Sequence, residues 1–390
     1  MIVLKKGRAE SLRARGHPWV YRGAVERAEG PALEGSLSPV ADPAGKVLGW
    51  AFYSPSSLIA ARLAFWGEEA PPEDWLERRL GEAAALRRRL ALDSDAFRLV
   101  NAEGDWLPGL VVDVYRSTTV VRPLVRGLEL AMERIVGELS ALFPGNAVYL
   151  KRDEKAARLE GLKLPGGYLS GSGDGRQRIR EGSLELEVDI ERGQKTGFYL
   201  DQRDSRLLVH RLSPGRRVLN LFAYAGAFAL QAAAGGAVEA VSVESSPAAL
   251  QTARRSAGLN PALPADRLSW VEGDVFRYLE DGSEGKSYDL VIVDPPPFAR
   301  RRSEVPGALK GYTQLNRLAL SRTAPEGLVL TFSCSSAVSP QLFTEALQEA
   351  ARQAGRRVQL LQALAASADH PVALGHPEGE YLKGWLLNVR

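Results

Sequence analysis

The sequence predicts an α/β fold, with a mostly parallel, doubly wound sheet in the C-terminal half preceded by a β-rich domain and a small α+β domain. After about residue 185, near-continuous apolar runs such as VLNLF, AVSVE and LVIVD alternate with helical stretches, as in sheets that are buried on both faces. Residues 1–67 instead show strand patterns punctuated by Gly and Pro. The 390 residues are also too many for one compact core. We therefore expect three domains, over residues 1–67, 70–180 and 185–390.

The first two domains have recognisable elements. Residues 45–66 alternate as two strands about a turn at Ser54-Pro55, and a linker with two prolines follows at 68–75. The middle domain is predicted to hold a helix, several strands and turns, a second helix and a last strand, over residues 74–92, 97–124, 128–143 and 146–153. We expect Arg87–Arg89 to lie on the solvated face of the first of these helices.

Composition restricts the class of protein. The chain is 45% hydrophobic and 25% charged, which is ordinary for a globular protein. No apolar run approaches the roughly 20 residues that span a bilayer, and the N-terminus lacks the apolar core of a signal peptide. We therefore expect a cytoplasmic protein that does not enter a membrane. A single cysteine excludes a disulfide within the chain, and four histidines argue against a metal site.

The N-terminal residues combine positive charge with aromatic rings. Residues 1–22 contain a single acid against six cationic side chains: Lys5, Lys6, Arg8, Arg13, Arg15 and Arg22. Trp19 and Tyr21 are interleaved with them. Cations neutralise phosphates and aromatic faces stack bases, so the segment suits RNA, with Arg8, Arg15 and Trp19 as candidate contacts. A solvated basic terminus would show the same charge pattern.

Ligands of parallel α/β sheets lie outside the carboxyl ends of the strands, so the residue after each strand is a candidate. The first such segment is NLFAYAGAFAL, residues 220–230, where Gly226 lies in a tight turn entering a helix. A small residue there lets a ligand approach the backbone near a helix N-terminus. The G-x-G-x-x-G fingerprint is absent, which disfavours a nicotinamide or flavin cofactor.

Acidic residues follow the next three strands. Glu244 ends the second strand, where a carboxylate can accept both hydroxyls of a ribose; the alternative is a charge that favours the N-terminus of the next helix. Asp274, after the third strand, suits an adenine amino group or a helix N-cap, and the two roles can coexist. Asp294 follows the fourth strand and precedes three prolines and Phe298. The prolines stiffen this loop and so hold an acid and an aromatic ring in place.

The fifth strand ends in SCSS, which contains Cys334. Together these strand ends are typical of an S-adenosylmethionine-dependent methyltransferase. Nearly the whole chain resembles the bacterial 23S ribosomal RNA cytosine-C5 methyltransferases that carry an N-terminal PUA domain. The resembling segments follow in family order: GHPWVYRGAV, RLVNAEGDWLPGLVVDVY, GQKTGFYLDQR, NLFAYAGAF, DPPPF, SCS and DHPVALGHPEGEYLKGWLLNV.

The resemblance implies a PUA domain, a central α+β domain of EEHEE type and a Rossmann-like methyltransferase domain. It implies S-adenosylmethionine as cofactor, a cytosine of 23S rRNA as substrate, Cys334 as nucleophile and Asp294 as its partner. The GQKTGFYLDQR segment is expected near the cofactor. The candidate cofactor-binding residues are Phe198, Asp201, Asn220, Phe222, Gly226, Glu244, Asp274 and Asp294.

The chemistry explains why such an enzyme needs a thiol. Carbon 5 of cytosine is too electron-poor to attack a methyl sulfonium, but a thiolate that adds to carbon 6 converts the ring into a nucleophilic enamine. A free thiol has a pKa near ~8.5, so positive charge or dipoles should lower it here. Asp294 is expected to hydrogen-bond the N3 or amino edge of the base, and Phe298 to stack on it. Another group of RNA cytosine-C5 enzymes has a second cysteine after its Asp-Pro, and this chain has none; the base that removes the C5 proton is therefore not identified.

Other interpretations stay open at this point. A lone buried cysteine is usually an inert hydrophobe. An N-methyltransferase of guanine or adenine, a small-molecule methyltransferase and a non-catalytic RNA-binding or ribosome-assembly factor fit parts of the pattern.

The target base must be single-stranded or flipped out. A homodimer is compatible with the family, although no interface signature is visible. His370 and Lys383 lie in the C-terminal segment that resembles the family, and either can reach the pocket from there, but a loop histidine is more often structural.

Overall fold

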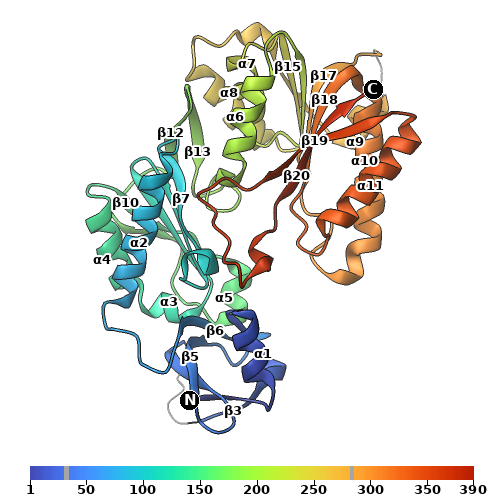
Figure 1. Ribbon diagram of the computed structural model, residues 1–390. Helices are drawn as coiled ribbons and strands as arrows, with labels where there is room; N and C mark the ends of the chain where they lie inside the picture. Colours follow the sequence, from blue (N-terminus) through green and yellow to red (C-terminus); the bar gives the residue numbers. More distant parts are fainter. Residues whose placement is uncertain (30–34, 282–284) are drawn as a thin grey trace. The chain divides into compact units, whose positions relative to one another are not determined.

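The computed structural model describes residues 1–29, 35–281 and 285–390. These form two compact units (Figure 1), each assembled from separate stretches of chain. The first unit contains Met1–Ile179, Val188–Leu200 and Ala368–Gly379; the second contains Arg180–Glu187, Asp201–Ser367 and Glu380–Arg390. Two stretches of the expected third domain thus belong to the first unit. The division into three domains stays a prediction.

The N-terminal part of the first unit is a six-stranded sheet in the order β2-β6-β5-β4-β1-β3. Its elements are β1 (Ile2–Leu4), α1 (Arg8–Arg15), β2 (Trp19–Tyr21), β3 (Val25–Ala28), β4 (Leu37–Ala41), β5 (Val47–Tyr53) and β6 (Ile59–Trp66). Apolar side chains alternate along these strands and form one small core that includes Leu4, Val20 and Leu63. The two strands predicted within residues 45–66 are confirmed as β5 and β6.

The second sheet of this unit has the order β11-β10-β9-β8-β7. Its elements are α2 (Trp75–Leu90), β7 (Ala96–Asn101), β8 (Leu110–Tyr115), β9 (Thr118–Pro123), α3 (Arg126–Leu130), α4 (Met132–Leu142), β10 (Ala147–Leu150), α5 (Glu154–Glu160) and β11 (Gly167–Ser170). The predicted helix over 128–143 is interrupted at Ala131. The prediction of a solvated face is wrong for Arg87, which is only 4% exposed because buried acceptors surround its guanidinium.

The second unit contains the predicted doubly wound sheet, in the order β16-β15-β14-β17-β18-β20-β19. Its strands are β14 (Arg217–Leu221), β15 (Glu239–Glu244), β16 (Leu268–Glu272), β17 (Tyr288–Val293), β18 (Thr323–Ser333), β19 (Val358–Ala365) and β20 (Lys383–Val389). The first five are parallel, whereas β20 pairs antiparallel with both β18 and β19. The α/β prediction and the five strand ends identified from sequence are confirmed.

Helices cover both faces of this sheet (Figure 1). They are α6 (Arg203–Leu212), α7 (Ala227–Ala234), α8 (Pro247–Gly258), α9 (Val275–Asp281), α10 (Val305–Ser321) and α11 (Pro340–Ala354). One buried cluster joins α9, α10 and α11 to alternate residues of the central strands, and a second joins α6 and α7 to the residues between them. Among the helices that the structure describes, none has the length and apolar content needed to cross a bilayer.

A two-stranded ribbon, β12 (Arg176–Glu181) and β13 (Leu184–Asp189), precedes the parallel sheet. Glu181 accepts two hydrogen bonds from the Arg206 guanidinium, the longer of them at 2.7 Å, and both side chains are buried. Because a buried pair is costly to break from one side, we expect Glu181→Gln to lower the free energy of unfolding by about 3–5 kcal/mol. Urea titration measures the change. The exposed Glu349–Arg352 pair is the matched control, and Glu349→Gln should leave the urea midpoint nearly unchanged.

Candidate active site

The strand register gathers the predicted residues at one edge of the second unit's sheet. Leu221, the last residue of β14, pairs with Val243 of β15 and with Val293 of β17. Phe222, Glu244 and Asp294 each follow one of these paired residues, so they lie side by side at the carboxyl ends of three adjacent strands. Val293 in turn pairs with Thr331 of β18, which brings the end of that strand, with Cys334 just beyond it, to the same edge.

The turn after β14 has an unusual backbone. Phe222, Tyr224 and Gly226 all have left-handed φ angles, of 56°, 48° and 72°. A Cβ atom on Gly226 would lie 2.5 Å from the Trp270 ring and 2.8 Å from Ala253, so close packing requires glycine there as well. The predicted tight turn is confirmed. Backbone strain of this kind persists where surrounding structure enforces it, often at ligand sites.

Glu244 holds this turn. Its carboxylate accepts hydrogen bonds from the Tyr224 N–H (2.8 Å), the Ser246 N–H (2.9 Å) and the Ser245 hydroxyl (3.3 Å). A carboxylate offers about four acceptor positions, so about one remains for a ligand hydroxyl. Asp274 accepts the Arg277 N–H at 3.0 Å, which confirms that it caps the N-terminus of α9.

Two buried amides at this edge have spare hydrogen-bonding capacity. Asn220 is 1% exposed, and neither its amide oxygen nor its amide nitrogen has a partner among the described residues. Gln202 donates its amide N–H to Asp294 at 3.1 Å, whereas its Oε1 atom is buried and has no such partner. Buried polar atoms rarely stay unsatisfied, so these amides are suited to bind a ligand or a water molecule. Gln202 was not predicted from sequence, although it lies within the GQKTGFYLDQR segment.

The Cys334 thiol is partly buried. Its sulfur lies 3.7 Å from the carbonyl oxygen of Pro295, the residue after Asp294. The side chain also packs against the apolar cluster that includes Ile292 and Phe332. The structure thus brings together the two residues predicted to be catalytic, which are 40 positions apart in the sequence.

A rigid polar frame surrounds the turn that carries the thiol. The Tyr312 hydroxyl of α10 lies 2.9 Å from the hydroxyls of Ser333 and Ser335, on either side of Cys334. Burial raises the pKa of Tyr312, so this hydroxyl stays protonated. The Ala299 N–H also donates to the Ser335 hydroxyl, at 3.1 Å. The turn is therefore tied to the loop that follows Asp294.

Phe298 is placed by the same frame. Its ring packs on that of Tyr312, with centroids 4.7 Å apart, and a Cβ atom on Gly311 would approach it to 3.1 Å. One face of the predicted stacking ring is thus occupied by protein. Three exposed arginines, Arg300, Arg301 and Arg302, begin two residues after Phe298, and the sequence pattern did not indicate them.

The GQKTGFYLDQR segment is divided between the two units. Phe198 is buried in the first unit, where its N–H donates to the Tyr115 hydroxyl at 3.2 Å. Asp201 is buried in the second unit, where its carboxylate accepts a hydrogen bond from the Tyr381 hydroxyl and its backbone oxygen accepts the Ser367 N–H. Both predicted cofactor residues therefore have structural partners in their own unit.

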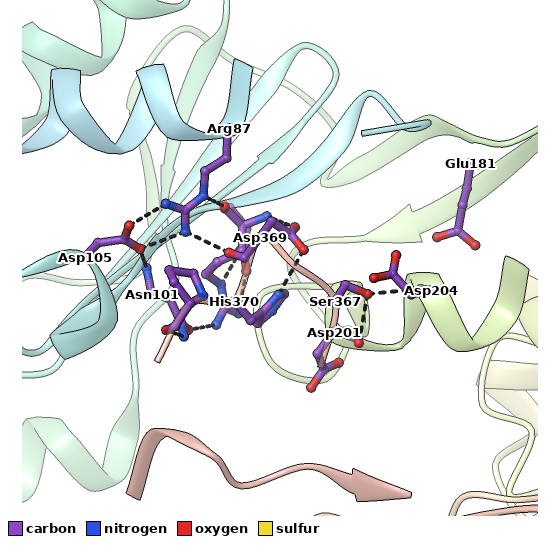
Figure 2. A network of polar contacts seen from close by, with 12 residues as sticks. Arg87, Asn101, Asp105, Glu181, Asp201, Asp204, Ser367, Asp369 and His370 are labelled. Atoms are coloured by element: carbon purple, nitrogen blue, oxygen red, sulfur yellow. Dashed lines mark hydrogen bonds and ion pairs between the residues drawn. The ribbon is translucent and has the colours of Figure 1, made fainter. Parts of the chain in front are cut away.

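Figure 2 shows the polar network that includes Arg87. Its guanidinium forms an ion pair with Asp105 and donates to the backbone oxygen of Asp369 at 2.7 Å. The His370 ring lies 3.2 Å from the Asp369 carboxylate and is buried. These residues belong to the first unit, where Asp369 holds the His370 ring.

The candidate RNA contacts of the first unit differ in exposure. Arg8 and Arg15 are exposed at the two ends of α1. Trp19 is half-buried: its indole N–H donates to Glu103 at 2.7 Å, and its ring centroid lies 4.5 Å from that of His376. The two arginines are open to a phosphate, whereas the indole already has protein partners.

Comparisons with known proteins agree with this geometry. Residues 159–373 match the S-adenosylmethionine-dependent methyltransferase family, and residues 2–66 match a PUA-like domain. The chain is 41% identical to "Ribosomal RNA large subunit methyltransferase I" of Erwinia tasmaniensis and 40% identical to that of Serratia proteamaculans, covering 100% of this chain and 99% of each relative.

Solved structures show the same fold. A methyltransferase in complex with SAH superimposes with a TM-score of 0.86 at 22% identity, and a SAM-dependent methyltransferase from Streptococcus mutans with a TM-score of 0.84 at 21% identity. Both alignments cover 100% of each chain. With its matched domains and its full-length relatives, the chain belongs to the S-adenosylmethionine-dependent methyltransferases, in the family of ribosomal RNA large subunit methyltransferase I.

Proposed function

We propose that this enzyme methylates carbon 5 of a cytosine in 23S ribosomal RNA through a transient bond between Cys334 and carbon 6 of the base. The observation that carries the proposal is the sulfur of the chain's single cysteine, 3.7 Å from the Pro295 carbonyl beside Asp294. Relatives that share about 40% identity over their full length are named for ribosomal RNA methylation. Such a substrate implies action in the cytoplasm.

The edge of the sheet fits S-adenosylmethionine. The unsatisfied Asn220 amide is buried two residues before the strained turn at Phe222 and Gly226. Glu244 keeps about one acceptor position. We assign Asn220, Phe222, Gly226, Glu244 and Asp274 to cofactor binding. When bound, the cofactor supplies an electrophilic methyl group on a sulfonium, and no metal is then required to activate it.

The residues of the chain do the remaining chemistry on the base. The Cys334 thiolate adds to carbon 6, and the displaced electron pair makes carbon 5 a nucleophile while charge develops on the pyrimidine ring. Asp294, held by Gln202, is positioned to bind the N3 and amino edge. With a proton on its carboxyl group, it donates that proton to N3 and so neutralises the negative charge of the ring. After methylation, a base removes the C5 proton, and the electrons of that C–H bond expel the thiolate. Water or a carboxylate such as Asp294 can serve as this base.

We assign RNA binding to Arg8 and Arg15 of the first unit and to Arg300–Arg302 beside the catalytic loop. Replacing both Arg300 and Arg302 with glutamine should weaken RNA binding and flatten its salt dependence, because each lost phosphate contact lowers the slope of log K against log salt by about 0.7 for single strands. Filter binding between about 50 and 200 mM salt measures the RNA affinity and its salt dependence. Arg352→Gln, an exposed arginine on α11, is the control. An unchanged slope in the double variant contradicts the assignment.

Mass mapping of 23S rRNA from a strain that lacks the gene tests the function itself. One cytosine should lose its C5 methyl group, and adding the gene back should restore it. Loss of a methyl group from guanine or adenine instead would support the N-methyltransferase alternative. An unchanged methylation pattern would support a non-catalytic RNA-binding factor. The family-based expectation of a homodimer is tested separately by analytical ultracentrifugation.

A further inference from the structure

Lys383 lies beside the catalytic turn but has no role in the mechanism above. It is the first residue of β20, and its register partner in β18 is Ser333, the residue immediately before Cys334. Its side chain is directed under the turn that follows the cysteine. Lys383 is only 6% exposed, which is rare for a lysine.

The hydrogen bonds of Lys383 leave its charge without a carboxylate. The ammonium donates to the backbone oxygens of Ser335 at 2.8 Å and Val338 at 2.9 Å. An ammonium has three N–H groups, and the residues that the structure describes provide neither a third acceptor nor an acidic partner within ion-pair distance. Burying a cation without an anion is costly. A neutral donor would hold the same two carbonyls at a lower cost, so the positive charge itself needs an explanation.

We propose that Lys383 is a positioning residue for the reaction: it fixes the turn that presents Cys334 and favours the thiolate over the thiol. This inference rests on the proposed function, because only a nucleophilic cysteine needs to ionise. In this arrangement the anion that compensates the buried ammonium is the thiolate itself, which is present when the enzyme is ready to attack the base.

The other ionisable groups around the turn do not replace this charge. Burial lowers the pKa of Lys383, while negative charge on Cys334 and on Glu380 acts in the opposite direction. Glu380 is exposed, so solvent screens it. Tyr312, on α10, stays neutral because burial raises its pKa. Asp294, on the loop after β17, has a carboxyl group and supplies no positive charge. Lys383 is therefore the cation that faces Cys334 from the strands packed against the turn.

The single cysteine makes a direct test possible, because alkylation of the chain by iodoacetamide reports on Cys334 alone. The pH dependence of the alkylation rate is measured for wild type, Lys383→Gln and Lys383→Arg. Glutamine keeps N–H donors for the two carbonyls but removes the charge; arginine keeps the charge. We expect Lys383→Gln to raise the midpoint by about one pH unit and to slow alkylation about tenfold at neutral pH, with Lys383→Arg close to wild type.

Tyr312→Phe is the control for a purely structural role. It removes hydrogen bonds to both serines that flank Cys334 without changing a charge, so its midpoint should match wild type. Coincident profiles for wild type and Lys383→Gln, or an equal shift in Tyr312→Phe, would overturn the proposal. Circular dichroism checks that each variant is folded.

A second measurement does not depend on the folding of a lysine variant. If thiolate and ammonium stabilise each other, removing the thiol must lower the pKa of Lys383 by the same coupling. NMR titration of the lysine ¹³Cε signals should show this in Cys334→Ala relative to wild type, and an unchanged Lys383 midpoint would refute the coupling. Neither experiment uses RNA or cofactor. If the titrations contradict the coupling between Lys383 and Cys334, the methylation assays still test the proposed function. If the methylation assays fail, the titrations still test the coupling.

Discussion

Replacing Cys334 with alanine is expected to reduce methyl transfer to cytosine by at least about a thousandfold, the scale on which covalent enzymes lose turnover when their nucleophile is removed. The chain contains no other thiol that can take over the attack. Without the adduct, carbon 5 is not nucleophilic, so the loss should be in kcat, with little change in the affinity for RNA. Transfer of a labelled methyl group to 23S rRNA fragments measures it.

The same variant separates the proposed mechanism from its nearest rival. An N-methyltransferase needs no thiol, so its activity would survive Cys334→Ala. Ser336→Ala is the matched control, because Ser336 is exposed in the same turn and should tolerate the change. RNA that contains 5-fluorocytosine gives a further readout. Fluorine cannot leave as a proton does, so the adduct should persist on a denaturing gel with wild-type enzyme. It should be absent with Cys334→Ala.

The sequence predicts the methyltransferase fold, and the edge of the sheet where the candidate residues lie, because both depend on local patterns. A parallel strand buried on two faces must be almost wholly apolar, so the strands that precede Glu244, Asp294 and Cys334 are visible in the sequence. Parallel strands place their carboxyl ends at one edge. That rule alone brings an acid, a stiff proline loop and a thiol near one another, and the register of β14, β15, β17 and β18 confirms it.

The sequence does not reveal partners that come from distant parts of the chain. Arg87 belongs to a run of three arginines on an amphipathic helix, which normally indicates a solvated face. Its backbone acceptor, the Asp369 carbonyl, is 282 positions away, and Glu103, the acceptor for Trp19, is 84 positions away. Nothing in the local composition indicates such contacts. The sequence marks Lys383 only through the segment that contains it, since its burial and its carbonyl partners depend on the pairing of β20 with β18.

Replacing Asp294 with asparagine should have the second largest effect, a fall in kcat of about 10²–10⁴-fold. Asparagine has nearly the same shape, and its amide oxygen can still accept the Gln202 N–H that now reaches the carboxylate at 3.1 Å. The loop, stiffened by Pro295–Pro297, should therefore keep its place. What is lost is the proton that a carboxyl group can donate to N3 of the base, and the carboxylate that can take up a proton afterwards.

Gln202→Ala shows whether kcat depends on the carboxyl group of Asp294 itself or on the orientation of that group. It leaves the carboxylate but removes its buried amide donor, so Asp294 should remain active but less well oriented, with a smaller loss of about tenfold. Both variants are measured by single-turnover methyl transfer and by adduct formation with 5-fluorocytosine RNA. If Asp294→Asn forms the adduct as fast as wild type, proton donation by Asp294 does not assist the attack on carbon 6. Asp294 must then act after methylation, as the base that removes the C5 proton.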